Sequence, residues 1–329
     1  MSFLNKIKLN YNVKLIDDYI EKEEFDNINN ILKNFLIKDP FLFFGILKNL
    51  DSKNLYDVKF KNFYNDKKFV WINSFDPSDT CLLSDFLKFY LERIGHSTQV
   101  GVFGEKLLDL MVEKKYPNFN NIINFENMVQ NSNFYQTLLL YSNLNDLPVL
   151  SSSSAFFETK NEPKKYLINH NSTHCLFFIL NNPKMLFQRY KKELSSSQLA
   201  MNQLSNYDQK HYEIALNISS QEYKFYENRQ SWNIHAKSWN DPNVQSAFRV
   251  KIIKYEDFMN NPEETFSSVL FHLKQHGLEI EINHDLVDEF IKSNSNEGPS
   301  KYENISNQER KSLLRDIDKN ILEHFEFVI

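Results

Sequence analysis

Short apolar-rich runs alternate with stretches of helical periodicity through most of this chain. Runs at Phe69–Ser74, Cys175–Leu180 and Phe248–Lys254 predict three strands, because a strand covered on both faces needs few polar positions. A fourth, shorter strand is predicted within Leu147–Ser154, where apolar residues run into a row of serines. Strands separated by helices are typical of a parallel sheet flanked by helices, so we expect an α/β fold.

The helix after the first strand has the clearest periodicity. From about Thr80 onward an apolar stripe repeats at helical spacing, and it consists of Leu82, Leu83, Phe86, Leu87, Tyr90, Leu91 and Ile94. Ser78 or Asp79 is expected to cap the start of this helix. Gly95 is expected to supply the left-handed residue at its end.

Later segments carry their own start and stop signals. Two helices are predicted to begin with a cap residue followed by proline, at Asn182-Pro183 and Asn261-Pro262. A third is predicted to begin with a Ser-x-x-Glu capping box at Ser306–Glu309. Gly277 suits the end of the second of these helices. Helices are also predicted at Glu105–Lys114 and Asn133–Tyr141, and the polar and aromatic region Ser196–Trp239 is predicted to be mostly helical.

Residues 1–66 have a different pattern, and we expect a helical N-terminal extension there, followed by an α/β domain at 67–329. Apolar residues near helical spacing lie on one face, namely Ile28, Ile31, Leu32, Phe35 and Leu36. The pattern breaks at Asp39-Pro40. Two helices packed as a hairpin fit this segment.

Composition narrows the classes of function. The 329 residues are 41% hydrophobic and 25% charged, as in soluble globular proteins. The net charge of −5 does not predict the positively charged surface that binds nucleic acid. No apolar run suits a signal peptide or a membrane span, so a cytoplasmic location is expected. The only cysteines, Cys81 and Cys175, predict neither a disulfide framework nor a cysteine metal site.

The turn Ser74–Asp79 raises the main question about function. Strand–turn–helix units of parallel sheets often hold a phosphate, because ligands bind at the carboxyl ends of the strands and helix N-termini attract anions. This turn has no glycine or lysine, and it carries Asp76 and Asp79. It therefore lacks the groups that usually surround and neutralise a phosphate.

Four segments, in order, resemble the sulfotransferase family, whose members transfer a sulfuryl group from 3′-phosphoadenosine 5′-phosphosulfate (PAPS) to a hydroxyl or amine. "FVWINSFDPSDTCLLSDFL" is similar to the family's first strand, phosphate loop and helix, and "CLFFILNNPKMLFQRYKKE" to its Arg-Asn-Pro-x-Asp unit. "SWNIHAKSWND" resembles its Trp-x-x-His-x-x-Ser-Trp helix, and "FRVKIIKYEDFMNNPEETFSSVLFHL" its Tyr-Glu-Asp turn and Asn-Pro helix. The resemblance covers roughly residues 67–329 and implies a P-loop-like sheet that binds PAPS.

The resemblance also implies which residues would hold PAPS. They are Ser78, Asp79 and Thr80 in the 5′ loop, Asn181 and Arg189 in the 3′-phosphate unit, Tyr255 near the nucleotide, and Lys301 in the C-terminal loop. Pro77 and Asp79 stand where the family's loop has lysine and glycine, and Asn181 stands where it has arginine. Losing two charge-assisted hydrogen bonds removes roughly 3–6 kcal/mol, against about 8 kcal/mol for a micromolar ligand. Arg189, which stands where the family has serine, is the expected replacement for the missing arginine.

The family's catalytic base belongs to a Lys-Thr-His segment, and this chain has the serines of Ser151–Ser154 there. Transfer requires a group that takes the proton of the acceptor, so His170, His174 and Lys160 are the candidates, with no catalytic residue assigned. The spacing of the two histidines also fits a metal pair, but no third ligand accompanies them. We therefore expect both to hydrogen-bond the backbone, and we expect no metal site.

Three functions remain open. The first is a PAPS-dependent sulfotransferase acting on a hydroxyl of a carbohydrate or another small-molecule acceptor. The second is a catalytically inactive relative that serves as a binding or assembly partner, with surface aromatic residues supplying an interface to a protein. The third is an enzyme of the same architecture that uses another donor, such as a sugar nucleotide, with Asp76 and Asp79 holding a divalent cation.

Overall fold

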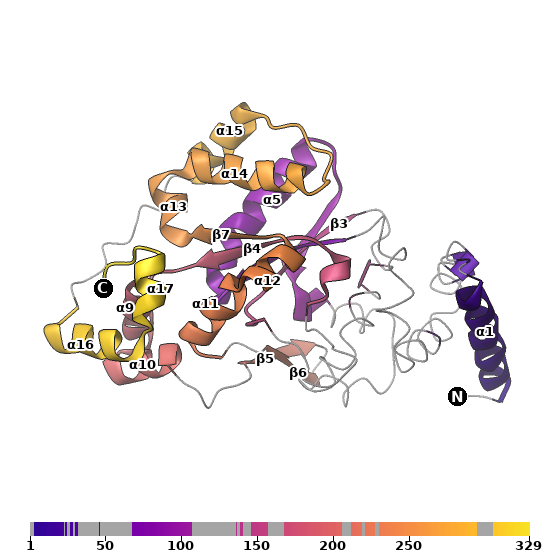
Figure 1. The fold of residues 1–329 in the computed structure, drawn as a ribbon, viewed down its shortest axis with the longest axis horizontal. Helices are drawn as coiled ribbons and strands as arrows, with labels where there is room; N and C mark the ends of the chain where they lie inside the picture. Colours follow the sequence, from indigo (N-terminus) through magenta and orange to yellow (C-terminus); the bar gives the residue numbers. More distant parts are fainter. Residues whose placement is uncertain are drawn as a thin grey trace.

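A five-stranded sheet forms the centre of this computed structural model (Figure 1). The strand order is β2-β3-β1-β4-β7, and every neighbouring pair in it is parallel. The strands are β1 (Phe69–Ser74), β2 (Thr98–Val102), β3 (Leu147–Ser152), β4 (Thr173–Leu180) and β7 (Val250–Lys254). The expected α/β fold with a parallel central sheet is confirmed. Because all strands run the same way, the loops after β1, β3, β4 and β7 meet at one edge.

The structure describes only part of the chain in the N-terminal region and in several loops. The described residues are 3–22, 24, 27–28, 30–31, 46, 68–106, 136, 139–140, 146–156, 168–205, 212–218, 221–227, 230–294 and 305–329.

Side chains of the central strands alternate between two buried clusters, one on each face of the sheet. On β1, Val70 and Ile72 pack into one cluster, and Phe69 and Trp71 pack into the other. Every residue of β1 is buried. A strand with both faces covered has no solvent side, which explains why its sequence is a nearly continuous apolar run.

Helices cover both faces of the sheet (Figure 1). One layer consists of α5 (Cys81–Arg93), α14 (Pro262–Gln275) and α15 (His284–Asn294), with the short α13 (Tyr255–Asn260) leading into it. The other layer consists of α9 (Pro183–Leu194), α10 (Ser197–Ser205), α11 (Trp232–Asn240), α12 (Pro242–Phe248), α16 (Asn307–Asp316) and α17 (Lys319–His324). Buried aromatic residues join the first layer, since the ring of Phe86 lies 4.3 Å from that of Phe266 and 5.2 Å from that of Phe290.

Two predictions of secondary structure need correction. The edge strand β2 was not expected, because its sequence "TQVGV" lacks an apolar run, and its residues are all half-buried. The described part of the region Ser196–Trp239 is not mostly helical. It contains α10 and α11, but between them lies an antiparallel hairpin of β5 (Tyr212–Ile218) and β6 (Gln221–Glu227). The alternation of polar and apolar residues in "YEIALNI" and "QEYKFYE" is the period of a strand.

Most of the predicted helix signals are confirmed. Asn182 caps α9 by accepting a hydrogen bond from the N–H of Lys184, and Ser306 forms the full capping box of α16 with Glu309. Gly95 and Gly277 have φ angles of +90° and +93° after α5 and α14. Residues 105–106, 136 and 139–140 are helical, and the rest of the two helices predicted at Glu105–Lys114 and Asn133–Tyr141 lies outside the described residues.

The capping prediction for α5 is wrong. Neither Ser78 nor Asp79 caps this helix, because a 3-10 turn, η1 (Pro77–Thr80), comes between it and β1. Asp76 caps that turn instead, by accepting a hydrogen bond from the N–H of Ser78. This shift of the cap leaves the carboxylate of Asp79 free for another contact.

Most of the described part of residues 1–66 is helical. It contains α1 (Phe3–Glu21) and helical positions at 27–28, 30–31 and 46. Of the predicted hairpin, the break at Asp39-Pro40 and the apolar positions 32, 35 and 36 lie outside the described residues. In the part of the chain that the structure describes, no helix is both long and apolar enough to cross a membrane.

Candidate functional site

The loop between β1 and α5 folds around its own aspartate. Asp76 Oδ1 accepts hydrogen bonds from the N–H of Ser78 at 3.0 Å and from the hydroxyl of Ser78 at 2.8 Å. Thr80 donates its hydroxyl proton to the carbonyl of Pro77 at 2.8 Å. The hydroxyl groups of Ser78 and Thr80 are therefore engaged in shaping the loop itself.

Arg189, on the second turn of α9, reaches this loop from the neighbouring strand–helix unit. Its Nη1 lies 2.7 Å from Asp79 Oδ1, 3.4 Å from Asp76 Oδ2 and 3.1 Å from the hydroxyl of Ser78. The guanidinium carbon also lies 5.9 Å from the ring centroid of Tyr255, within the range of a cation–π contact. One guanidinium thus neutralises two carboxylates of the loop.

Asn181 approaches Asp79 from the end of β4. Its side-chain amide donates a hydrogen bond to Asp79 Oδ2, and its backbone carbonyl accepts one from the indole N–H of Trp232 at 3.3 Å. Asp79 is 2% exposed and Asn181 is also 2% exposed. We call Asp76, Ser78, Asp79, Asn181 and Arg189 the Asp79 cluster.

Burial dominates the electrostatics of Asp79. It raises the pKa of this carboxyl group to about 6, and the charge of Asp76 adds to the rise, although the charge and hydrogen bond of Arg189 oppose it. Asp76 shows the opposite net effect. Burial opposes its ionisation too, but hydrogen bonds from Ser78 and Tyr190 and the charge of Arg189 lower its pKa below the usual value. Asp79 is therefore the group of the cluster that titrates near neutral pH.

A second carboxylate lies at the start of α9. Glu256, in the Tyr-Glu-Asp turn after β7, accepts a hydrogen bond through Oε1 from the backbone N–H of Asn182 at 3.2 Å. Burial raises the pKa of Glu256. Helix N-termini attract anions, and in this chain that position is filled by one of its own side chains.

The structure brings most of the predicted nucleotide-binding residues together. Ser78, Asp79, Asn181 and Arg189 are in direct contact, and Tyr255 lies against Arg189. Thr80 is in the same loop but bonds to the loop backbone. Lys301 and Lys160 lie outside the described residues.

The two histidine candidates are at the opposite edge of the sheet. His170 lies in a 3-10 turn, η3 (His170–Ser172), before β4, and His174 is the second residue of β4, while Asn181 follows its last residue. Asn181 is seven positions after His174 along the chain, which corresponds to roughly 23 Å of strand. The side chain of His174 hydrogen-bonds the backbone of His276. Neither histidine is near the Asp79 cluster.

The serine row at the end of β3 is structural. The carbonyl of Ser154 accepts hydrogen bonds from the side-chain amide of Asn73 at 2.9 Å and from the indole of Trp239 at 3.0 Å. Ser238 accepts a further bond from the N–H of Phe156 at 3.0 Å. These contacts join β1, β3 and α11 where the resembling family has its base.

Sequence reasoning missed two polar residues at this edge, Asn73 and Glu256. Asn73 is the only side-chain amide in the apolar run of β1, and this exception in the sequence could have indicated a functional role. Within the described residues, Asn73 Oδ1, Asn181 Oδ1 and Glu256 Oε2 are buried acceptors that receive no hydrogen bond. Buried acceptors without donors are unusual, and here they gather at the carboxyl ends of β1, β4 and β7.

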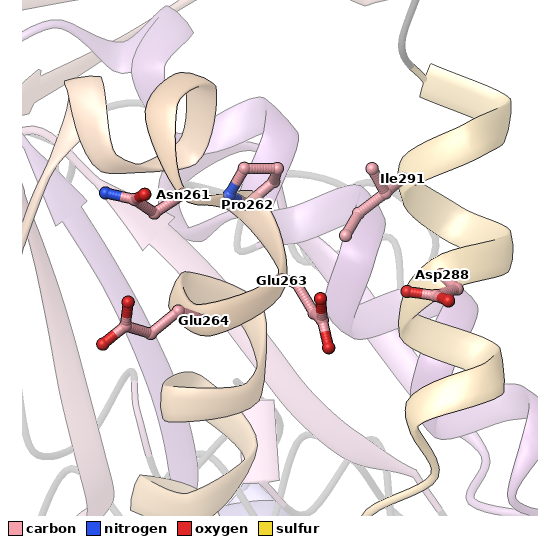
Figure 2. Close-up of a pocket in the computed structure, with 6 residues that line it drawn as sticks. All are labelled: Asn261, Pro262, Glu263, Glu264, Asp288 and Ile291. Carbon is pink, nitrogen blue, oxygen red and sulfur yellow. The ribbon is translucent and has the colours of Figure 1, made fainter.

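A pocket of about 400 Å³ opens between α14 and α15 and is not lined by the Asp79 cluster. Its lining residues are Asn261, Pro262, Glu263, Glu264, Asp288 and Ile291. Figure 2 shows the carboxylates of Glu263 and Asp288 extending from neighbouring helices toward the space between them. An acidic lining does not suit a sulfate or phosphate donor.

The described residues contain no group of three or more His, Cys, Asp or Glu side chains placed to hold a metal ion. Asp76 and Asp79, the pair considered for a divalent cation, already share the guanidinium of Arg189. Within the described residues, the positive charge that faces these two aspartates is therefore the guanidinium of Arg189.

These features define the class of the protein. It has an α/β fold with an all-parallel central sheet and a polar cluster in the strand–turn–helix loop at the carboxyl edge. Comparison with known protein families gave no match to this chain, and no curated protein matched it in sequence.

Proposed function

We propose that this protein is a catalytically inactive relative of the PAPS-dependent sulfotransferases, and that the carboxylate of Asp79 takes the place of a nucleotide phosphate. In this proposal the chain works by binding a partner molecule, and it does not transfer sulfuryl groups. The observation that carries the proposal is the 2.7 Å contact between Asp79 and Arg189.

The partners of Asp79 support this reading. An anion in a phosphate loop needs a cation, polar N–H donors and a nearby helix start. Asp79 receives a guanidinium from Arg189 and an amide N–H from Asn181, the two residues expected to contact the 3′-phosphate. A ligand phosphate would therefore compete with a carboxylate that is already held in place.

The energetics of displacement favour the internal carboxylate. Removing one partner of a buried ion pair costs about 3–5 kcal/mol. That energy corresponds to roughly a hundredfold or more in ligand affinity. The missing loop glycine and lysine add to this loss, because a glycine turn lets backbone N–H groups approach a phosphate closely.

The test is calorimetric titration with 3′-phosphoadenosine 5′-phosphate at pH 7.5 and low salt. We expect wild-type protein to bind it at millimolar concentration or not at all, and Asp79→Asn to bind it about a hundredfold more tightly. Adding Arg189→Ala to Asp79→Asn should remove the gain. Asp85→Asn, which removes an exposed carboxylate of α5, is the control for net charge.

Two results would overturn the proposal. One is micromolar binding by wild-type protein that Arg189→Ala weakens, because the site would then be open. The other is absence of binding by a folded Asp79→Asn variant at millimolar nucleotide, because the cluster would then not be a closed nucleotide site.

The position of Arg189, which contacts both Asp79 and the hydroxyl of Ser78, favours a second candidate function, because the burial that raises the pKa of Asp79 to about 6 allows this carboxylate to be protonated in mild acid. Protonation of Asp79 in mild acid weakens its hold on Arg189, and the guanidinium then becomes available to a phosphate. The protein would in that case be an active sulfotransferase whose donor site opens as the pH falls. Titration of wild-type protein at pH 5.5 separates the two functions, since this candidate requires micromolar binding there and sulfuryl transfer from PAPS.

A further inference from the structure

Six basic side chains gather at the amino-terminal edge of the sheet, the edge opposite the Asp79 cluster. They come from the residue before β1, from β4, from the turn before β7, from β7 and from the last turns of α14. They are Lys68, His174, Arg249, Lys251, His272 and His276. All six are half-buried, and burial disfavours the charged form of a basic side chain.

Hydrogen bonds and a ring contact hold this basic cluster together. Arg249 Nη1 donates to the carbonyls of His174 at 2.9 Å and Thr173 at 3.2 Å. His272 Nε2 lies 2.8 Å from the carbonyl of Arg249, and the ring centroids of His272 and His276 are 4.5 Å apart. The geometry is therefore fixed by backbone carbonyls of β4 and of the turn before β7.

The six side chains also act on one another electrostatically. Burial and the charge of Arg249 lower the pKa of Lys68, and burial and the charges of Lys68 and Arg249 lower the pKa of His174 to about 4. Burial lowers the pKa of His272 to about 4, with contributions from His276 and Lys251. Each member thus lies within range of at least one other positive group.

No counter-ion accompanies these charges within the described residues. The ion pairs of that part of the chain involve other basic residues, such as Arg189, Lys191 and Lys237. The Nε and Nη2 atoms of Arg249 make no hydrogen bond to the described residues. The lowered pKa values of His174 and His272 leave these two rings neutral at pH 6.5, so the unpaired cations are the two lysines and Arg249. Half-buried cations without a partner are unfavourable, and an anion bound among them would relieve their repulsion and favour protonation of the histidines.

We propose that the basic cluster binds a compact, multiply charged anion of the phosphate type, at a site separate from the Asp79 cluster. Arg249 offers the unused side of its guanidinium, which suits two oxygens of one phosphate. Lys68 and Lys251 supply point charges, and His174, His272 and His276 supply N–H donors when protonated. The shared ligand chemistry is a phosphate or diphosphate group, either free or at the end of a small metabolite.

The site is independent of the proposed function. β4 separates the two clusters by roughly 23 Å, and no residue belongs to both. A failure of nucleotide binding at Asp79 would leave the basic cluster unchanged, and the converse also holds.

The first experiment is calorimetric titration of the full chain with inorganic pyrophosphate at pH 6.5 and low salt. We expect saturable one-to-one binding, and we expect Lys68→Gln with Lys251→Gln to weaken it roughly tenfold or more. The matched control is Lys88→Gln with Lys319→Gln, which removes the same charge from exposed helical positions and should leave the affinity unchanged. Asp79→Asn should leave it unchanged as well.

A second readout separates a specific site from general attraction. Bound pyrophosphate stabilises protonated histidine, so the pKa values of His174, His272 and His276, followed by NMR, should rise. The NMR signals of His284, which is exposed on α15, should not change. The proposal is overturned if pyrophosphate does not bind, if both double variants weaken binding equally, or if the three histidines keep their pKa values on saturation. Titration with glucose 6-phosphate then distinguishes a metabolite from a free phosphate.

Discussion

The carboxylate of Asp79 and the guanidinium of Arg189 lie 2.7 Å apart, although 110 positions of sequence separate them. The contact joins the first strand–turn–helix unit to the second at the carboxyl edge of the sheet. Because Asp79 is 2% exposed, water screens the charges of this pair only weakly. Stability and ligand binding at this edge therefore depend on the same two groups.

We predict that Arg189→Ala destabilises the protein by about 3 kcal/mol at pH 8, because it leaves a buried carboxylate without its counter-ion. In an Asp79→Asn background the same change should cost less, since the charge of Asp79 is gone and only the longer contact of Arg189 with Asp76, at 3.4 Å, is lost. The measurement is urea unfolding of the wild type, the two single variants and the double variant. The four unfolding free energies give the coupling energy between Asp79 and Arg189. Equal losses in both backgrounds would show that the two residues are not coupled.

We predict a pH-dependent difference between Asp79→Asn and wild type. The folded state raises the pKa of Asp79 from 3.8 to about 6, so the folded chain binds more protons than the unfolded chain between these values. This contribution to stability is present below about pH 4 and is lost as the pH rises through 6. The unfolding free energy of Asp79→Asn minus that of wild type should accordingly increase from pH 4 to 6.5 and then level off.

The measurement is chemical unfolding at pH steps across this window, with Asp85→Asn as the control. The difference between variant and wild type also cancels the contributions of His174 and His272, whose lowered pKa values act in the opposite direction over the same range. A difference that stays flat with pH would contradict the raised pKa of Asp79.

We predict that Glu309 stabilises α16 through two separable contacts. It accepts a hydrogen bond from the N–H of Ser306 at 2.8 Å in the capping box, and it forms an ion pair with Lys191 at 2.8 Å. Although burial opposes ionisation, these contacts and the hydrogen bond from Ser197 lower the pKa of Glu309 to about 2. Its contribution should thus be complete above pH 4.5 and disappear as the pH falls toward 2.

Glu309→Ala should destabilise the protein by about 1 kcal/mol at pH 7, because it removes both contacts. Glu309→Gln keeps a capping side chain and loses only the ion pair, so it should cost a few tenths of a kcal/mol. Thermal unfolding at pH 7 and pH 3 compares them. If the two variants were equally unstable, the capping contact would contribute nothing.

Local signals in the sequence predicted much of this fold. The run Phe69–Ser74 is buried on both faces, the Asn182-Pro183 pair opens α9, and Gly95 ends α5 with a left-handed residue. Each of these depends on neighbouring residues only: apolar continuity, a side chain that reaches the next N–H, or a backbone without Cβ. Such features are present in the sequence itself.

The features that were missed depend on distant residues. β2 has little apolar character of its own and is a strand because it pairs with β3. Asp79 looked like a helix cap, but Asp76 takes the capping role, and the carboxylate of Asp79 meets Arg189 and Asn181. Arg189 was expected in this site as a phosphate ligand. Its carboxylate partner could not be seen from the sequence.

The strand order has a consequence for how the chain reaches its native state. β1 lies between β3 and β4, so its first sheet partner begins only at Leu147 and its second at Thr173. Each pairing closes a long segment of chain before it gains hydrogen bonds, which gives the protein a high contact order. A nascent chain would carry the exposed apolar segment Phe69–Ser74 while more than seventy residues are added. During synthesis this strand therefore needs protection from aggregation until its partners have been made.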